Sequence, residues 1–391
     1  MQRVSAVRIA YVTETYPPEI NGVALTVERA VRHLRARGHQ VDLVRPRQPG
    51  ESMRCDDAEW RSFGLPLPMY RDLRFGLAFA RTLKRRWTAR RPQVVHVATP
   101  GPLAWAAVRA AQALEIPLTS DFRTNFHQYS HYYGLGWFEP VVCDYLRRLH
   151  NRSHRTFVPT RSVRRELNRK GFERLAVVGR GVDALRFSPE HRSRSLRTQW
   201  GARRETPVVL YVGRLAAEKN VPLALRAFEA IRTAHPEAQM VVVGDGPMRR
   251  RWQDDHPTVR FVGPLRGEAL AQHYASADIF LFPSLSDTFG NVVLEAMASG
   301  LAVVAYDTGA AGEHIDDCES GLLLPPGDEA GFIAAACSLA LQQPRLGWMR
   351  AAARQAALQA TWAAALDRFE AHLMDAAHAM ETSDARTACP A

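Results

Sequence analysis

The sequence predicts an α/β protein of two doubly wound domains, each with a parallel, Rossmann-like sheet. Its length of 391 residues fits two or three domains. Short β-type runs alternate with amphipathic helical runs in the first half, and the same alternation begins again in the second half. This alternation is typical of a parallel sheet that is covered by helices on both faces.

The first half contains five predicted strands separated by helical sequence. The first strand, at 7–12, is followed by a loop rich in Pro, Gly and Asn. A helix is expected over 23–37, because its apolar residues share one face and Gly38 ends it. The other predicted strands are 41–44, 94–97, 117–120 and 156–158.

In the second half the predicted strands are 207–212, 239–243, 259–262, 279–282 and 302–305. The polar, basic stretch 180–203 is interpreted as a hinge with one short helix, and 345–380 is Ala-rich and predicted to be helical throughout. We therefore expect four parts: a first domain over 1–189, a second domain over 190–360, a helix over 361–381 that crosses back to the first domain, and a flexible tail over 382–391. Since ligands bind at the carboxyl ends of parallel strands, the site is expected in a cleft across which the two domains face one another.

Charge is distributed unevenly along the chain. The formal net charge is +11, and residues 1–200 carry +18 while residues 201–391 carry −7. A basic half could contact nucleic acid, an anionic membrane or a phosphorylated ligand. Only three of the 51 cationic residues are lysines, so a general bias towards arginine is an equally good explanation. Hydrophobic residues at 46% exclude a disordered chain.

The five cysteines are scattered and show no metal-like spacing, which predicts reduced thiols and no metal site. The first residues lack the apolar run of a signal peptide, and no run of about 18 apolar residues occurs. We therefore expect a cytoplasmic protein, in contact at most with the inner surface of the cytoplasmic membrane.

Two loops of the second half carry candidate phosphate ligands. Arg214 and Lys219 follow the strand at 207–212 and precede a helix, an arrangement suited to a diphosphate. The alternative is a surface ion pair with Glu218. The turn GDGP at 244–247 could also suit a phosphate, although a plain strand–helix turn is the better interpretation.

The most informative stretch is FPSLSDTFGNVVLEAMASG at 282–300. Phe289, Gly290 and Asn291 are expected in the first turn of a helix, where backbone N–H groups are available to a ligand. Asp287 precedes this turn and could accept hydrogen bonds from ligand hydroxyls, or cap the helix. Glu295 lies in an apolar helix and needs a polar partner, either a ligand or a neighbouring residue.

In the first half, Asn21 and Gly22 precede a helix and allow a phosphate to approach the backbone. Asp121, Arg123 and His127 follow the strand at 117–120, with aromatic residues close behind in the sequence. Aromatic faces beside polar groups suit a sugar, and ordinary aromatic packing is the alternative.

Taken together, these loops resemble the retaining glycosyltransferases of family 4, which have the GT-B fold. The resemblance spans nearly the whole chain and depends on YPPEINGV, VVHVATPGP, the GVD…FSP segment, GRLAAEK, VGDGP and DTFGNVVLEAMASG in that order. The segments FRTNFHQYSHYYG and DTFGNVV are similar to those of bacterial GDP-mannose-dependent α-mannosyltransferases.

The resemblance implies that the domain over 1–189 lies on the acceptor side and that the domain over 190–360 binds the nucleotide sugar. It also implies a role for each matching residue. Arg214, Lys219 and Gly22 match positions that bind the donor diphosphate. Asp287 matches the first carboxylate of the family's E-x7-E motif, which faces the transferred hexose, and Glu295 matches the second, which contacts the ribose. The turn Phe289, Gly290 and Asn291 matches backbone amides that hold sugar hydroxyls.

Three departures from the family pattern stand out. Asp287 is one methylene shorter than the usual Glu, and Asn21 replaces the first glycine of a pair. The histidine that follows the middle strand of the first domain aligns with Arg123, while His127 lies four residues on. Either could contact the donor sugar, but a guanidinium cannot act as a general base.

The resemblance therefore implies transfer of a hexose, expected to be α-mannosyl from GDP-mannose, to a lipid-linked or glycan acceptor, with retention and without a metal cofactor. A UDP-sugar-dependent hexosyltransferase that makes a glycolipid is the first alternative, and a nucleotide-sugar epimerase is another. Nucleic-acid binding is not expected, because the basic half lacks a recognisable motif. The stretch 70–91 carries seven Arg and one Lys among apolar residues, and we interpret it either as a basic amphipathic helix on an anionic membrane or as a core-packed helix.

Overall fold

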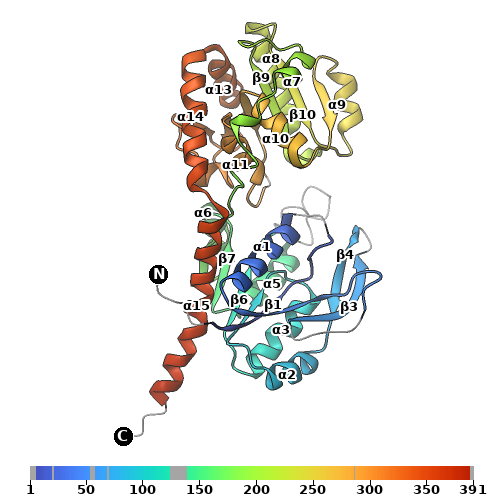
Figure 1. The fold of residues 1–391 in the computed structure, drawn as a ribbon, viewed down its shortest axis with the longest axis vertical. Helices are drawn as coiled ribbons and strands as arrows, with labels where there is room; N and C mark the ends of the chain where they lie inside the picture. The colour runs from blue at the N-terminus through green and yellow to red at the C-terminus, as the bar shows by residue number, and fades with distance from the viewer. Residues whose placement is uncertain are drawn as a thin grey trace. The chain divides into compact units, whose positions relative to one another are not determined.

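A computed structural model describes residues 6–19, 22–52, 58–67, 70–123, 139–285 and 287–387, which form two compact units (Figure 1). Unit 1 contains the described residues up to 123 together with 139–178 and 366–387, and unit 2 contains 179–365. Each unit has its own sheet, so the predicted α/β fold with two Rossmann-like domains is confirmed.

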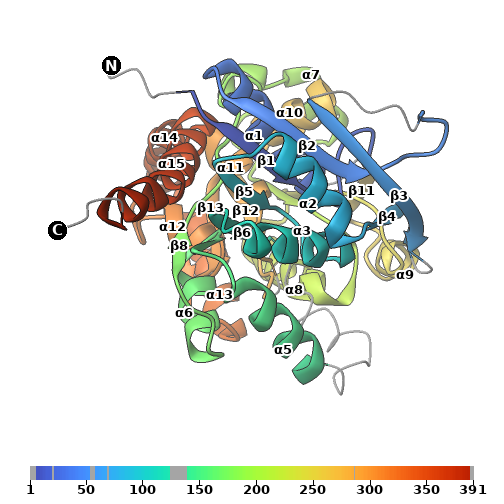
Figure 2. The same cartoon turned by 90° about the horizontal axis from the view of Figure 1, so that it is seen from below.

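The sheet of unit 1 has the order β4-β3-β2-β1-β5-β6-β7-β8 within the described residues. Its strands are β1 Arg8–Val12, β2 Gln40–Pro46, β3 Glu59–Leu67, β4 Tyr70–Leu77, β5 Val94–Val97, β6 Leu118–Asp121, β7 Arg155–Val158 and β8 Leu175–Val177. Neighbouring strands are parallel except for β3 and β4, which form an antiparallel hairpin. This hairpin lies at one edge of the sheet, as Figure 2 also shows.

Helices cover both faces of this sheet. The described helices of unit 1 are α1 Gly22–Ala36, α2 Ala80–Ala89, α3 Pro102–Ala113, α5 Glu139–His150, α6 Arg161–Arg169 and most of α15 Trp362–Thr387. Val27 and Val31 of α1 pack with Phe369 of α15 against β1, whereas Leu83 of α2 and Leu103 of α3 belong to a second core. Among the described helices, none has the length and apolar character needed to cross a membrane.

A buried carboxylate ties α15 to α1. Glu370 accepts hydrogen bonds from Arg37 Nε at 3.1 Å, and its oxygens lie 2.8 Å from His33 Nε2 and 3.2 Å from His39 Nε2. Burial opposes the charged form of Glu370, but the bonds from His39, His33 and Arg37 outweigh it and lower the pKa of this carboxyl. Ion pairs as well as apolar packing therefore hold α15 against α1 within unit 1.

The prediction of one helix over 70–91 is wrong. Residues 70–77 form β4, and only 80–89 are helical. Phe75, Leu77 and Phe79 are spaced by two, which is the period of a strand, whereas Leu83 and Trp87 are spaced by four and are buried in α2. The intervening arginines obscure this change of period.

The stretch predicted as one helix over 345–380 is also interrupted. α14 ends at Gln359 and α15 begins at Trp362, and Thr361 between them pairs with Val182.

The sheet of unit 2 has the order β11-β10-β9-β12-β13-β14, and all of its pairings are parallel. The strands are β9 Val208–Val212, β10 Gln239–Val243, β11 Arg260–Gly263, β12 Ile279–Phe282, β13 Ala302–Tyr306 and β14 Gly321–Leu324. The α-helices are α7 Arg194–Gln199, α8 Val221–Ala234, α9 Arg249–Asp255, α10 Gly267–Ser276, α11 Asn291–Ala298, α12 Ala311–His314, α13 Glu329–Leu341 and α14 Gln343–Gln359. Short 3₁₀ helices are η2 Pro189–His191 and η3 Ala217–Lys219.

A buried aspartate joins several elements of unit 2. Asp278 precedes β12, and its carboxylate accepts hydrogen bonds from Arg192 at 2.7 Å, Arg197 at 3.0 Å and Arg350 at 3.0 Å, and from the backbone N–H of Val208. These donors come from the segment before β9, from β9 itself and from α14. A charge buried in this way is stable only because every lone pair is directed at a donor.

Candidate functional site

The loop after β9 carries the predicted diphosphate ligands. Gly213 follows the last residue of β9, and Lys219 ends η3 just before α8. Arg214 is half exposed and lies 3.8 Å from Glu218 Oε1, a buried carboxylate. The ion pair weighed as an alternative is therefore present, yet it leaves the Arg214 guanidinium at the carboxyl end of β9, where a phosphate can reach it.

The loop after β10 packs directly against this loop. A Cβ atom at Gly244 would lie 1.9 Å from the carbonyl oxygen of Gly213, and Gly244 has φ of +139°. Leu215 also donates its backbone N–H to the carbonyl of Asp245 at 2.9 Å. Only glycine permits this approach, so the GDGP turn serves at least to hold the Arg214 loop in place.

Gly290 forms the entry to α11. It has φ of +84° and is the N-cap residue, with no side chain bonded to the cap. Among the described residues Asp287 does not cap the helix, because its Oδ2 has no hydrogen-bond partner and its Oδ1 pairs with Lys219. The N-cap glycine itself has no side chain to offer the N-terminal N–H groups of α11, which suits this helix N-terminus to a ligand.

An ion pair joins the loop after β9 to the loop after β12. Lys219 Nζ lies 2.8 Å from Asp287 Oδ1. The second carboxylate oxygen, Oδ2, is buried and receives no hydrogen bond from any described residue. Burial raises the pKa of the neighbouring Tyr211, and the charges of Asp287 and Glu218 raise it further. β9 and β12 are adjacent in the sheet, which brings together two residues that are distant in the sequence.

Glu295 lies on α11 and has a protein partner. The Tyr274 hydroxyl of α10 donates a hydrogen bond to its Oε2 at 3.0 Å. Burial raises the pKa of Glu295 to about 7, although the Tyr274 bond and the charge of Arg186 act in the opposite direction. This carboxyl is consequently poised to change charge near neutral pH.

Arg180 is a further candidate site residue, which sequence reasoning missed. Its guanidinium lies 5.7 Å from the centre of the Phe289 ring, and Nη1 donates to Asn291 Oδ1 at 3.4 Å. Phe289 itself is buried and accepts a backbone hydrogen bond from Ala310. The position of Arg180 directly before the GVD segment is the signal that could have identified it.

In unit 1, Arg123 belongs to a buried polar chain. Its Nε donates to Asp121 Oδ2 at 2.5 Å, and the same oxygen lies 3.2 Å from His96 Nε2. His96 Nδ1 in turn lies 2.9 Å from Thr119 Oγ1. Burial opposes the charge of Asp121, but Arg123 and His96 outweigh this effect and lower the pKa of the carboxyl. Arg123 is therefore a cation held in a set direction at the carboxyl end of β6.

Two further positions lie near the carboxyl end of β1. Gly22 is exposed and begins α1. Glu14, which sequence reasoning missed, is buried and accepts the backbone N–H of Leu103 at 2.8 Å. Burial raises the pKa of Glu14 to about 8 despite this hydrogen bond. His127 and Asn21, with the aromatic residues after His127, lie outside the described residues.

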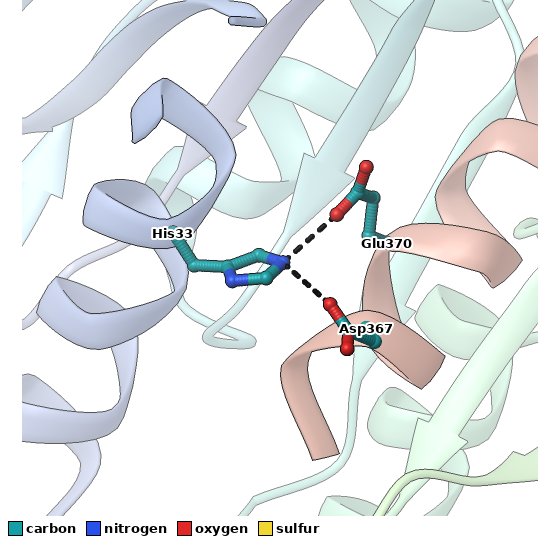
Figure 3. A group of neighbouring side chains, drawn as sticks. All are labelled: His33, Asp367 and Glu370. Atoms are coloured by element: carbon teal, nitrogen blue, oxygen red, sulfur yellow. Dashed lines mark hydrogen bonds and ion pairs between the residues drawn. The ribbon is translucent and has the colours of Figure 1, made fainter. Parts of the chain in front are cut away.

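One group of described residues could reach a cation. Side-chain atoms of His33, Asp367 and Glu370 gather between α1 and α15 (Figure 3). His33 Nε2 lies 3.6 Å from Asp367 Oδ1 and 2.8 Å from Glu370 Oε2. Arg37 donates to this Glu370 oxygen as well, so a guanidinium already neutralises the carboxylate. The arrangement fits a structural ion-pair cluster better than a metal site.

Two family models together match most of this chain. The family described as Glycosyltransferase Family 4 matches residues 20–186, and the family described as Glycosyl transferases group 1 matches residues 206–342. The GDP-mannose-dependent alpha-mannosyltransferase of Mycolicibacterium smegmatis is 35% identical over 93% of this chain and 96% of its own length. The alpha-monoglucosyldiacylglycerol synthase of Streptococcus pneumoniae is 27% identical over 81% of this chain and 75% of its own length.

The fold also matches solved structures. Sucrose-phosphate synthase from Thermosynechococcus elongatus superposes with a TM-score of 0.72 at 18% identity, covering 94% of this chain and 98% of that protein. At this identity the likeness concerns the fold alone.

Proposed function

This chain belongs to glycosyltransferase family 4, and from that premise we propose that it transfers an α-mannosyl group from GDP-mannose to a lipid-linked or glycan acceptor. That it is a glycosyltransferase which transfers a hexose follows from the family itself. The mannosyl donor is proposed because the relative from Mycolicibacterium smegmatis is named for that donor. A lipid acceptor is proposed because another relative is named as a synthase of a glucosyldiacylglycerol.

The observation that carries the proposal is the contact between Lys219 and Asp287 at 2.8 Å. It joins the residue expected to bind the donor diphosphate to the residue expected to face the hexose. When a donor binds, the diphosphate oxygens replace Asp287 as partners of Lys219, and the freed carboxylate accepts hydrogen bonds from sugar hydroxyls. Arg214 and the N-terminal N–H groups of α11 supply further donors for the substrate.

The proposed reaction breaks the bond between the anomeric carbon and the diphosphate oxygen. Negative charge then grows on the phosphate, where Arg214 and Lys219 stabilise it without a metal. The acceptor hydroxyl forms the new bond on the face from which the diphosphate departs, and its proton passes to the departing phosphate oxygen. Arg123 and His127 are the two candidates for contact with the donor sugar, and a guanidinium such as that of Arg123 cannot take a proton. Comparing the Arg123→Ala and His127→Ala variants for turnover identifies which residue serves the donor sugar.

A panel of nucleotide sugars tests the donor. GDP-mannose is expected to raise the melting temperature more than UDP-glucose or ADP-glucose at the same concentration, because the ligand with the lowest Kd stabilises the folded state most. A ligand at 100 times its Kd adds about 2.7 kcal/mol to the free energy of unfolding. With donor alone the enzyme should release GDP and mannose slowly, at a rate that EDTA leaves unchanged. A larger shift with a UDP sugar would overturn the mannosyl assignment, and recovery of an epimerised sugar would overturn the transferase reaction.

The affinity for the donor should depend on pH through Glu295. We propose that its carboxylate accepts hydrogen bonds from the ribose hydroxyls, which requires the deprotonated form. The pKa of Glu295 in the protein without donor is about 7. Donor Kd measured by calorimetry should therefore improve by about tenfold between pH 6 and pH 8. The Glu295→Gln variant should bind weakly with no such pH dependence, and Tyr274→Phe should move the transition to higher pH because it removes the bond to Oε2.

Without donor, the contribution of Glu295 to folding stability falls as the pH rises, whereas its contribution to donor affinity increases. The folded protein holds the Glu295 proton more tightly than the unfolded chain, whose value is near 4.5. The contribution of Glu295 to stability is therefore greatest below pH 4.5 and is lost as the pH rises to about 7.

A donor affinity that stays constant from pH 6 to pH 8 in the wild type would refute the assignment of Glu295 to the ribose.

A further inference from the structure

The β3–β4 hairpin exposes large apolar side chains on one face and turns two glycines towards the rest of unit 1. Phe63 pairs with Leu77, and Leu65 pairs with Phe75, so these four side chains share one face. Their exposed fractions are 53% for Phe63, 42% for Leu77, 43% for Leu65 and 38% for Phe75, and Phe79 just after β4 is 70% exposed. We call these five residues the hairpin patch.

The opposite face of the hairpin is packed against unit 1. Gly64 and Gly76 pair with one another on that face. A Cβ atom at Gly64 would lie 2.6 Å from the carbonyl oxygen of Arg47, and one at Gly76 would lie 2.9 Å from a Leu103 methyl carbon. No larger side chain fits at these two positions, so the face that carries the large apolar side chains stays directed outward. An antiparallel hairpin at a solvent-exposed edge ordinarily shows the reverse pattern.

Cations adjoin the hairpin patch. Arg81, Lys84 and Arg85 are exposed on α2, which begins one residue after Phe79, and the Arg81 guanidinium lies 5.0 Å from the centre of the Phe79 ring. Residues 59–91 contain nine Arg or Lys and only two Asp or Glu. A row of exposed aromatic and aliphatic side chains beside exposed cations is the composition that anionic lipid surfaces attract.

We infer that the hairpin patch is a docking surface for an anionic lipid bilayer, with Phe63, Phe75 and Phe79 entering the boundary between headgroups and acyl chains. The cations of α2 would lie at the level of the phosphates. Charge favours this occupant over a second copy of the chain, because two such basic segments would repel one another. The inference rests on the proposed lipid acceptor, which a surface-bound enzyme meets where it resides.

Sedimentation with lipid vesicles tests the inference on the full chain. The wild type is expected to bind vesicles of phosphatidylglycerol and phosphatidylcholine at least about tenfold more tightly than vesicles of phosphatidylcholine alone. Phe63→Ser with Phe75→Ser should weaken binding at least about tenfold. Lys84→Glu with Arg85→Glu should remove the preference for anionic vesicles. The matched control is Trp348→Ser, because Trp348 is an aromatic residue that is 55% exposed on α14 of unit 2. This variant should bind the vesicles as tightly as the wild type does.

Other outcomes would overturn the inference. These are absence of wild-type binding, equal binding by the Phe63→Ser/Phe75→Ser variant, and a dimer in sedimentation equilibrium that this variant abolishes. Its melting temperature and its rate of hydrolysis of donor alone should match the wild type, which separates loss of docking from loss of folding. Vesicle binding needs no sugar nucleotide, so a wrong donor assignment leaves this experiment unaffected.

Discussion

Replacing Lys219 with alanine is expected to lower kcat by about 100- to 1,000-fold, the loss measured when one preorganised donor to a developing oxyanion is removed. Its ammonium lies 2.8 Å from Asp287 and is mostly buried. Among the described residues, Lys219 is the cation paired with this carboxylate, so its removal is not compensated. Arg214→Ala should have a smaller effect on kcat and should weaken donor binding, because its guanidinium is half exposed. Steady-state kinetics with a saturating acceptor measure both changes.

Arg226→Ala provides the matched control for these variants. Arg226 has nearly the same exposure as Arg214 and also pairs with a glutamate of unit 2, but it lies on α8 away from the strand ends. Its loss should leave kcat and donor affinity unchanged, because exposed ion pairs contribute little. Normal turnover and donor affinity in both Lys219→Ala and Arg214→Ala would show that the diphosphate binds elsewhere.

Replacing Asp278 with alanine is expected to destabilise unit 2 by about 3–5 kcal/mol. The change leaves Arg197, which is buried, without its carboxylate, and it removes the shared acceptor of Arg192 and Arg350. Uncompensated buried charge costs far more than the loss of an exposed ion pair. Urea denaturation that follows the transition of unit 2 measures the difference in unfolding free energy.

Two further variants separate charge from shape at this position. Asp278→Asn keeps the size of the side chain and should still be strongly destabilising. Asp255→Ala removes an exposed aspartate that lies 3.8 Å from Arg251, and should cost less than about 1 kcal/mol. If Asp278→Ala were no more destabilising than Asp255→Ala, the cluster would not be what joins the segment before β9 to α14.

Most of the strands could be predicted because the evidence for them is local. The runs at 7–12, 207–212 and 279–282 are apolar apart from Arg8, and each coincides with a strand in the middle of its sheet. The hairpin could not be predicted in the same way. Its apolar residues alternate with arginines and glycines, so a period of two and a period near four are both present between residues 70 and 91.

The candidate site was predictable in its residue types but not in its contacts. Arg214 and Lys219 follow one strand and Asp287 follows another, so position relative to strand ends identified them. Their contact depends on β12 lying beside β9, although β10 and β11 come between them in the sequence. The Tyr274 hydroxyl at Glu295, and Arg180 over Phe289, likewise join residues of different elements.

The sequence by itself determined the α/β class, the two sheets, the family and the loops that carry the candidate ligands, because strand and helix patterns and short motifs depend on residues close together in the chain. Only the tertiary structure decided that Lys219 pairs with Asp287, that Arg123 is held by Asp121, and that the exposed apolar surface lies on the hairpin. These features depend on which strands are neighbours and on which face of each strand is covered. Burial, ion pairing and exposure arise from contacts between distant parts of the chain, and a local pattern does not contain them.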